Sequence, residues 1–295
     1  MYKNIETLLN QTKLLNMPLE RIILENEMLL TGLSEELIYN KLEQHYLVMK
    51  ESAAKALDNP QNMLGSLIKG QSKKQKNYSA DDTLSGSFIN KIMAMALSSS
   101  EVNAGMGCIC AAPTAGACGI LPAVLIGVSE NLGSSREQVL NALLIAGGLG
   151  AIIARNATLS GAEGGCQAEC GAAAAMAAGC AVYLKGGTAE MMANAVAIAL
   201  INCMGLVCDP VAGLVQLPCS FRNASQSVNA LISADMALAG QESVIPADEI
   251  INSMYRVGKH LPLELKETSL GGIATSKTGK KISDKIFKGM KKLFE

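Results

Sequence analysis

Side chains of the first part of the chain recur at the spacing of amphipathic helices. After Ser34, positions that would share one helix face are spaced three or four residues apart, at Ile38, Leu42, His45 and Met49. Ser34 is a suitable N-cap for this helix, because two glutamates follow it in the first turn, where the helix dipole favours acidic side chains. Pro18 suits the first turn of the preceding helix, and Gly32 suits its end. We expect residues 1–62 to form a helical lead-in.

Helix signals continue through the rest of the chain. Three further helix starts are indicated, at Ser135, Thr188 and Pro246. Ser135 and Gln138 have the spacing of a capping box. The helix that starts after Thr188 is predicted to end at residue 206, and Gly258 would close the helix that starts at Pro246. Alternating runs of β-branched residues are scarce. We therefore predict an all-α fold, a helical bundle around central helices rich in alanine and glycine.

One polar stretch, 64–82, interrupts this pattern. It contains four closely spaced lysines, and we interpret it as a solvated loop or the rim of an interface. The chain is then expected to form a single domain over 1–295. This domain would consist of the lead-in, the polar loop, and a helical core over 83–295 with glycine- and proline-rich turns.

Composition narrows the class of protein. Hydrophobic residues make up 49% of the chain, charged residues 17%, and the net charge is -1. These values exclude a disordered chain and give no electrostatic reason to expect a nucleic-acid partner. Charged residues are sparse between 102 and 240, yet this stretch holds all nine cysteines. The N-terminus lacks the apolar run of a secretory signal, so we expect reduced thiols in the cytoplasm.

Three runs without charge, 102–129, 138–154 and 191–208, raise the question of a membrane. Prolines and glycines interrupt the first run, and two asparagines lie in the third. Aromatic belts and a consistent asymmetry of Lys and Arg are missing from the flanking sequence. We interpret the runs as helices packed on all sides within a soluble bundle, not as membrane spans.

Four segments depart from helical periodicity in this charge-poor centre. They are rich in glycine, proline and cysteine, and cover 103–119, 160–171, 208–223 and 267–272. Cys166 and Cys170 would share a helix face, and Cys208 and Cys219 each lie near a proline, as cluster-ligating cysteines often do. Spacing alone leaves two interpretations open, a metal held by these four thiols or simple packing of small side chains. No C-x-x-C pair is present, which argues against structural zinc and ferredoxin-type electron transfer.

The four segments resemble, in order, the α chain of the iron–sulfur-dependent L-serine dehydratases. The matching strings are EVNAGMGCICAAPTAGACG, SGAEGGCQAECG, GLVCDPVAGLVQLPCSFRN, ADMALAG and LKETSLGGIA. The resemblance implies a [4Fe–4S] cluster held by Cys166, Cys208 and Cys219 with one iron left open, and no pyridoxal phosphate. Cys170 falls where relatives often have another residue, so it is expected to be a packing thiol.

The resemblance also implies a lyase of serine catabolism and gluconeogenesis, an L-serine ammonia-lyase that forms pyruvate and ammonia. The open iron would act as a Lewis acid on the serine hydroxyl. The general base, and part of the substrate pocket, are expected from a β chain, which would make the enzyme a heteromer. His45 and His260, the two histidines of this chain, are interpreted as structural.

Polar residues on the glycine-rich turns are candidates for binding the substrate. They are Asn103, Thr114 and Ser160, and each is as consistent with helix capping as with substrate binding. Glu163 and Glu169 flank Cys166 and would either support the site or lie on the surface.

Two departures from the family pattern are visible. Ser87 stands where many relatives are expected to have histidine, and no cysteine follows Cys219, so a C-terminal cysteine cannot reach the open iron. Two alternative functions remain at this stage. One is an L-cysteine desulfidase of the same superfamily, and the other is a non-catalytic helical subunit that binds a partner.

Overall fold

The computed structural model describes residues 1–78 and 82–294, with side chains as far as residue 288. Thirteen α-helices are found within this part of the chain. They are α1 (Ile5–Leu15), α2 (Leu19–Thr31), α3 (Glu35–Asp58), α4 (Gln71–Asn77), α5 (Gly86–Ala104), α6 (Ile120–Leu132), α7 (Arg136–Asn156), α8 (Gly161–Gly164), α9 (Ala172–Leu184), α10 (Ala189–Cys203), α11 (Cys219–Leu238), α12 (Ala247–His260) and α13 (Lys277–Phe294). Short 3-10 turns are η1 (Leu64–Ser66), η2 (Ala115–Ala117), η4 (Val211–Gly213), η5 (Leu263–Leu265) and η6 (Gly272–Thr275), and η3 (Gln167–Gly171) is a π-helical turn. The predicted all-α fold is confirmed.

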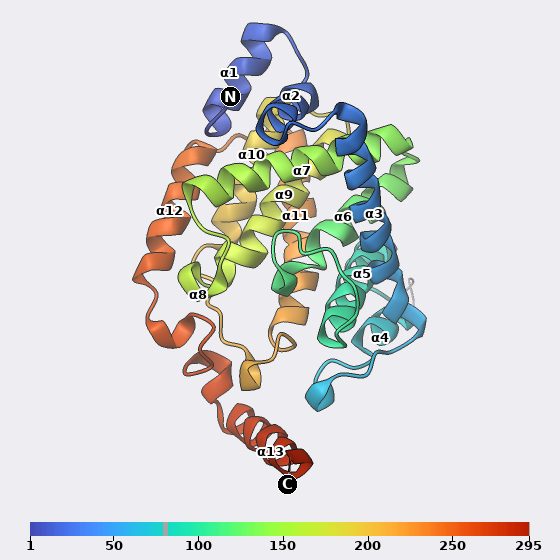
Figure 1. Ribbon diagram of the computed structural model, residues 1–295, viewed down its shortest axis with the longest axis vertical. Helices are drawn as coiled ribbons and strands as arrows, with labels where there is room; N and C mark the ends of the chain where they lie inside the picture. The colour runs from blue at the N-terminus through green and yellow to red at the C-terminus, as the bar shows by residue number, and fades with distance from the viewer. Residues whose placement is uncertain (79–81, 295) are drawn as a thin grey trace.

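Helix α9 forms the centre of the bundle. It packs against α6, α7, α10 and α11, and each of its residues except Tyr183 is buried (Figure 1). A helix that is apolar all round needs neighbours on every side, and alanine side chains allow those neighbours to approach closely. The alanine-rich sequence therefore explains the central position of α9.

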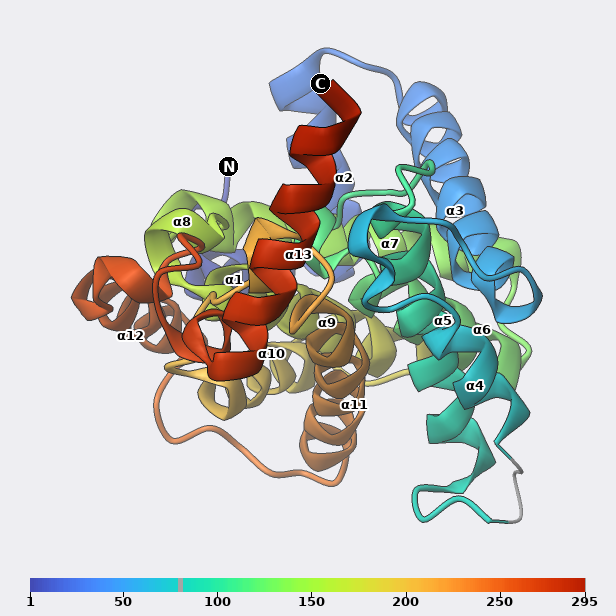
Figure 2. The ribbon, with the colours of Figure 1, turned by 90° about the horizontal axis from the view of Figure 1, so that it is seen from below.

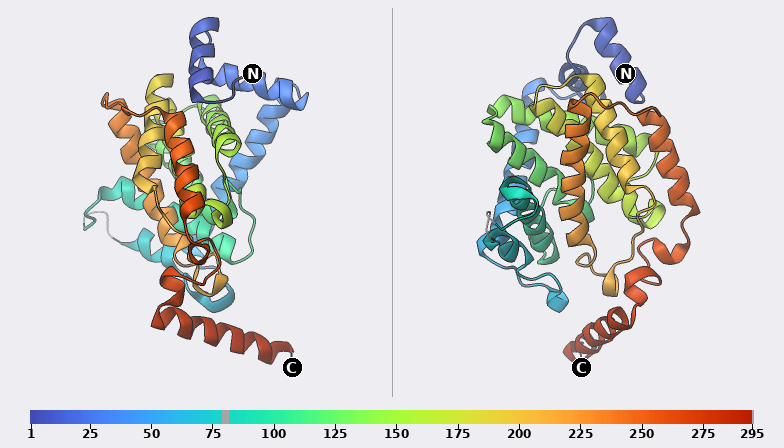
Figure 3. Two further views of the ribbon diagram at one scale, coloured as in Figure 1. Left: turned by 90° about the vertical axis from the view of Figure 1, so that its left-hand side faces the viewer. Right: turned by 180° about the vertical axis from the view of Figure 1, so that it is seen from behind.

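The remaining helices surround this centre. Helix α5 packs against α3, α4 and α11, and α12 packs against α10. Helices α1 and α2 lie at one end of the molecule, whereas α13 projects from the opposite end (Figures 1 and 3). Helix α13 contacts η1, η4 and η6, and Figure 2 shows it crossing this lower end.

Two segments are long and apolar enough to cross a membrane, Ala115–Leu132 and Arg136–Asn156. In the most apolar part of each segment, 72% of the first and 67% of the second is buried inside the protein. Core helices of a bundle meet the same criteria of length and composition, and these two segments pack in that way.

Most predicted helix ends are confirmed. Ser34 caps α3 by accepting a hydrogen bond from the Leu37 amide, and Ser135 forms the expected capping box with Gln138. Gly32 ends α2 in the left-handed conformation. Thr188 caps α10, although that helix ends at residue 203, three residues before the predicted end.

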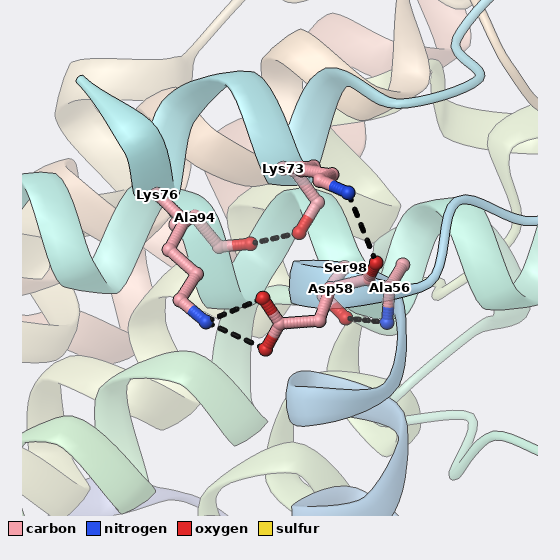
Figure 4. Close-up of polar contacts among 7 residues, drawn as sticks. Ala56, Asp58, Lys73, Lys76, Ala94 and Ser98 are labelled. Carbon is pink, nitrogen blue, oxygen red and sulfur yellow. Dashed lines mark hydrogen bonds and ion pairs between the residues drawn. The ribbon is translucent and has the colours of Figure 1, made fainter.

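The stretch 64–82 is not a continuous solvated loop, so that part of the prediction is wrong. It contains α4, which packs against α3 and α5; residues 79–81 lie outside the described part. Lys76 pairs with the Asp58 carboxylate and Lys73 donates to the Asp58 carbonyl (Figure 4). Buried Ser72 donates to the Ala94 carbonyl. Three of the four lysines therefore belong to a packed helix that composition alone could not distinguish from a loop.

Gly258 does not close α12, which continues to His260. A Cβ atom at Gly258 would lie 2.8 Å from the Gly164 Cα atom. This glycine therefore permits close packing of α12 on α8 and does not mark a helix end.

Candidate metal and substrate site

The three cysteines singled out by the resemblance lie at the ends of secondary-structure elements. Cys166 directly precedes η3, Cys208 lies on the segment after α10, and Cys219 is the first residue of α11. All three side chains are buried. Elements that start or stop at a ligand leave its side chain directed away from the regular helix packing, and π-helical turns are frequent at functional sites.

The three sulfurs influence one another. Burial raises the pKa of Cys219 to about 12, with a further contribution from Cys166. Burial also raises the pKa of Cys208, and Cys166, Glu169 and Cys219 add to this effect. Ionisation of one thiol therefore disfavours ionisation of the others, as expected of sulfurs that share one buried region.

No three His, Cys, Asp or Glu side chains in the described residues are placed to hold a single metal ion. A tetrahedral zinc ion bound by these thiols is therefore not supported. An iron–sulfur cluster makes a different demand, because each of its thiolates binds a separate iron and the sulfurs stand further apart.

Cys166 differs from the other two thiols. A hydrogen bond with Cys170 lowers its pKa, as does the nearby Arg222 guanidinium, although burial opposes both effects. The same hydrogen bond raises the pKa of Cys170. Cys166 is thus the thiol that most readily carries negative charge, with Cys170 as its donor.

The backbone at Cys208 is held by the fourth glycine-rich segment. Its amide donates to the Leu265 carbonyl and its carbonyl accepts from the Glu267 amide, both at 2.8 Å, in an isolated parallel β-bridge. The next residue, Asp209, accepts a hydrogen bond from the Ile273 amide at 2.8 Å. Two segments that are far apart in the sequence therefore fix the position of this thiol.

Glu169 lies in the site, whereas Glu163 lies on the surface, which resolves the alternative left open for each. Thr114 donates to Glu169 Oε1 at 2.8 Å, and the Cys208 thiol lies 3.9 Å from Oε2. Burial is the main cause of a raised pKa at Glu169. Glu163 is paired with exposed Lys259 instead.

Asn223, one turn after Cys219, connects the first segment to the third. Its side chain accepts from the Gly119 amide and donates to the Gly116 carbonyl, both at 2.7 Å. Asn103 donates to the Ala115 carbonyl at 3.1 Å. The turn that carries Thr114 is thus held against the cysteine-bearing elements.

The other predicted residues lie outside this network. Ser160 is exposed at the N-terminus of α8 and its side chain does not cap the helix, and Ser87 is exposed near the start of α5. His45 Nδ1 lies 3.9 Å from Cys110 Sγ, and His260 Nδ1 lies 2.7 Å from the Arg256 carbonyl. Both histidines are exposed, in keeping with structural roles.

Sequence reasoning missed Arg222 and Asp209. They form an ion pair of 2.8 Å in which the side chains are only 15% and 3% exposed. A signal was available, because both are charged residues in a stretch with few charges, where a buried charge requires a partner.

The chain matches the model of the family described as serine dehydratase alpha chain over residues 15–274. It is 43% identical over 290 residues to a probable L-serine dehydratase α chain of Bacillus subtilis (strain 168), which covers 98% of this chain and 96% of that protein. It is 49% identical over 262 residues to the L-serine dehydratase α chain of Peptoniphilus asaccharolyticus, covering 88% and 90%. An L-serine dehydratase of Escherichia coli (strain K12) is 43% identical over 188 residues, which amount to 63% of this chain and 41% of that protein.

Proposed function

Since the chain belongs to the serine dehydratase α-chain family, we propose that it is the α subunit of an iron–sulfur-dependent L-serine dehydratase. The chain is then part of a lyase that converts L-serine to pyruvate and ammonia. The observation that carries the iron–sulfur proposal is the burial of Cys166, Cys208 and Cys219 around η3, which packs against α11 and whose Glu169 lies 3.9 Å from the Cys208 thiol.

The donor set suits a [4Fe–4S] cluster. Three buried thiols on three separate elements match the number of ligands that a cluster with one open iron requires. When bound, such a cluster supplies a Lewis acid that polarises a hydroxyl group, so that it leaves as water. No pyridoxal phosphate is part of this proposal.

Thr114 and Glu169 are the groups of this chain that we assign to the substrate. Because Thr114 gives its hydroxyl hydrogen to Glu169, the Thr114 oxygen keeps its lone pairs for an ammonium group. Glu169 accepts from Thr114 through Oε1, and its Oε2 faces the Cys208 thiol. Asn103 supports the turn through Ala115, and substrate binding by Asn103 and Ser160 stays a prediction.

The base that removes the α-proton is proposed to come from a β chain. Neither exposed histidine lies among the hydrogen bonds of the thiol site. The Escherichia coli relative contains a further portion, since this chain matches only 41% of it. We assign the missing base to a partner that corresponds to such a portion, and we place the assembly in the cytoplasm, where nine free thiols stay reduced.

The test is anaerobic reconstitution of the chain with iron and sulfide, followed by assays with and without the co-expressed β chain. We expect a brown chromophore in the reconstituted chain itself. Pyruvate formation from serine is expected only when the β chain is also present. Sulfide release from cysteine without pyruvate from serine would indicate a cysteine desulfidase. A colourless protein that takes up no iron would indicate a non-catalytic subunit.

A further inference from the structure

Arg222 connects the helix that begins at Cys219 with the segment that carries Cys208. It lies on α11, one helical turn after Cys219. Its Nη1 donates to the Val207 carbonyl at 2.6 Å, and its Nη2 donates to Asp209 Oδ1 at 2.8 Å. These two acceptors belong to the residues on either side of Cys208.

The third contact is with Cys166. The Arg222 guanidinium lies near the Cys166 sulfur, and its positive charge favours negative charge on that sulfur. The Arg222 guanidinium therefore lies near the Cys166 sulfur and binds the residues on both sides of Cys208. Its own helix, α11, begins at Cys219.

Burial makes this arrangement specific. The Arg222 side chain is 15% exposed and Asp209 is 3% exposed, so removal of either partner leaves the other charge poorly solvated. The fixed fork of the guanidinium also permits simultaneous donation in several directions, which a lysine ammonium on a flexible stem reproduces only in part.

We propose that Arg222 is a positioning residue that holds the Cys208 segment against α11 and places positive charge beside the Cys166 sulfur, so that the three thiols retain an iron–sulfur cluster. This inference rests on the proposed function. Groups around metal ligands orient them and influence affinity by about 10- to 100-fold, and Arg222 is placed to do so for all three ligands at once.

The first test measures iron retention by the full-length chain. The parent, Arg222→Met and Arg222→Lys are reconstituted anaerobically with ferrous iron and sulfide, and iron transfer to a chelator is timed. We expect release about tenfold faster or more from Arg222→Met, and an intermediate rate from Arg222→Lys, which keeps the charge but loses the fork. Arg136→Met is the matched control, because Arg136 also forms an ion pair, with Glu43 on the surface, and its loss should leave release unchanged.

The second test uses the metal-free chain, so that it is independent of the cluster. The amides of Cys208 and Glu267 form the β-bridge of the Cys208 segment, and we expect their hydrogen exchange to be about tenfold faster or more in Arg222→Met. Exchange in α9 should not change, which would show that the variant is folded.

Parent-like iron release and parent-like exchange in Arg222→Met would overturn the inference. A parent chain that takes up no iron would instead contradict the proposed function. In that case, the exchange measurement alone would decide whether Arg222 orders the segment.

Discussion

Asp209 occupies the space that a side chain at Gly272 would need. A Cβ atom built on Gly272 would lie 2.1 Å from Asp209 Oδ2, and Gly272 has a φ of +56°. The Asp209 carboxylate accepts from Arg222 through Oδ1 and from the Ile273 amide through Oδ2. It therefore lies against the glycine pair of the fourth segment. The position of Cys208 therefore depends on a glycine more than sixty residues away.

Gly272→Ala should displace Asp209 and disorder the Cys208 segment. The steric conflict adds to the cost of a positive φ at a residue with a Cβ atom, so we expect a loss of about 2–4 kcal/mol in the free energy of unfolding. Urea denaturation measures this loss. Gly133→Ala is the control, because Gly133 has a φ of +63° but no atom within 4 Å of its Cβ position, and it should cost only about 1 kcal/mol.

Glu101 is a second buried carboxylate whose removal should be costly. It is fully buried, and its Oε1 accepts from the Gln61 and Gly70 amides at 2.8 Å each, which holds the segment between α3 and α4. Glu101→Ala would leave two part-buried amides without this acceptor, so we expect a loss of about 2 kcal/mol in urea denaturation. The exposed Glu51→Ala should change stability by less than about 0.5 kcal/mol, and equal costs for both variants would contradict this role.

The sequence was informative where local chemistry decides the structure. The cap at Ser34 and the capping box at Ser135 depend on residues a few positions apart, and both were predictable. Helix α4 was not, because its formation depends on how Ser72 and Lys76 meet the neighbouring helices α5 and α3 in space, which the residues of α4 alone do not specify. Motif resemblance selected three cysteines, and the structure buries all three in one region.

The support around those cysteines was not predictable from local sequence. The contacts of Asp209 with Arg222 and Ile273 join residues that are 13 and 64 positions apart in the sequence. Glu163 and Glu169 look alike in sequence, and only the fold places one beside Lys259 and the other beside Thr114.

Glu169 should make stability depend on pH. Its folded-state pKa is raised above 4.5, chiefly by burial, so its contribution to stability is fully present below pH 4.5 and is lost as the pH rises through the raised value. Glu169→Gln removes this titration. We therefore expect the metal-free parent to lose stability relative to Glu169→Gln between about pH 4.5 and neutrality, as measured by urea denaturation across that range.

Glu163→Gln provides a control of opposite sign. Lys259 lowers the pKa of Glu163, so the contribution of this carboxylate is present above its unfolded value of 4.5 and is lost as the pH falls through the lowered folded value. Parallel pH profiles for the two variants would show that burial of Glu169 is not the cause.

Cys170 should be dispensable for iron binding, although it lies beside a proposed ligand. It falls where relatives often have another residue, so the family resemblance assigns it to packing and not to iron ligation. Cys170→Ala should therefore keep the broad visible absorbance of the reconstituted chain, whereas alanine at Cys166, Cys208 or Cys219 should abolish it. Cys180→Ala, at a fully buried thiol on α9, controls for the loss of a buried sulfur. Loss of absorbance in Cys170→Ala with retention in Cys219→Ala would show that the ligand assignment is wrong.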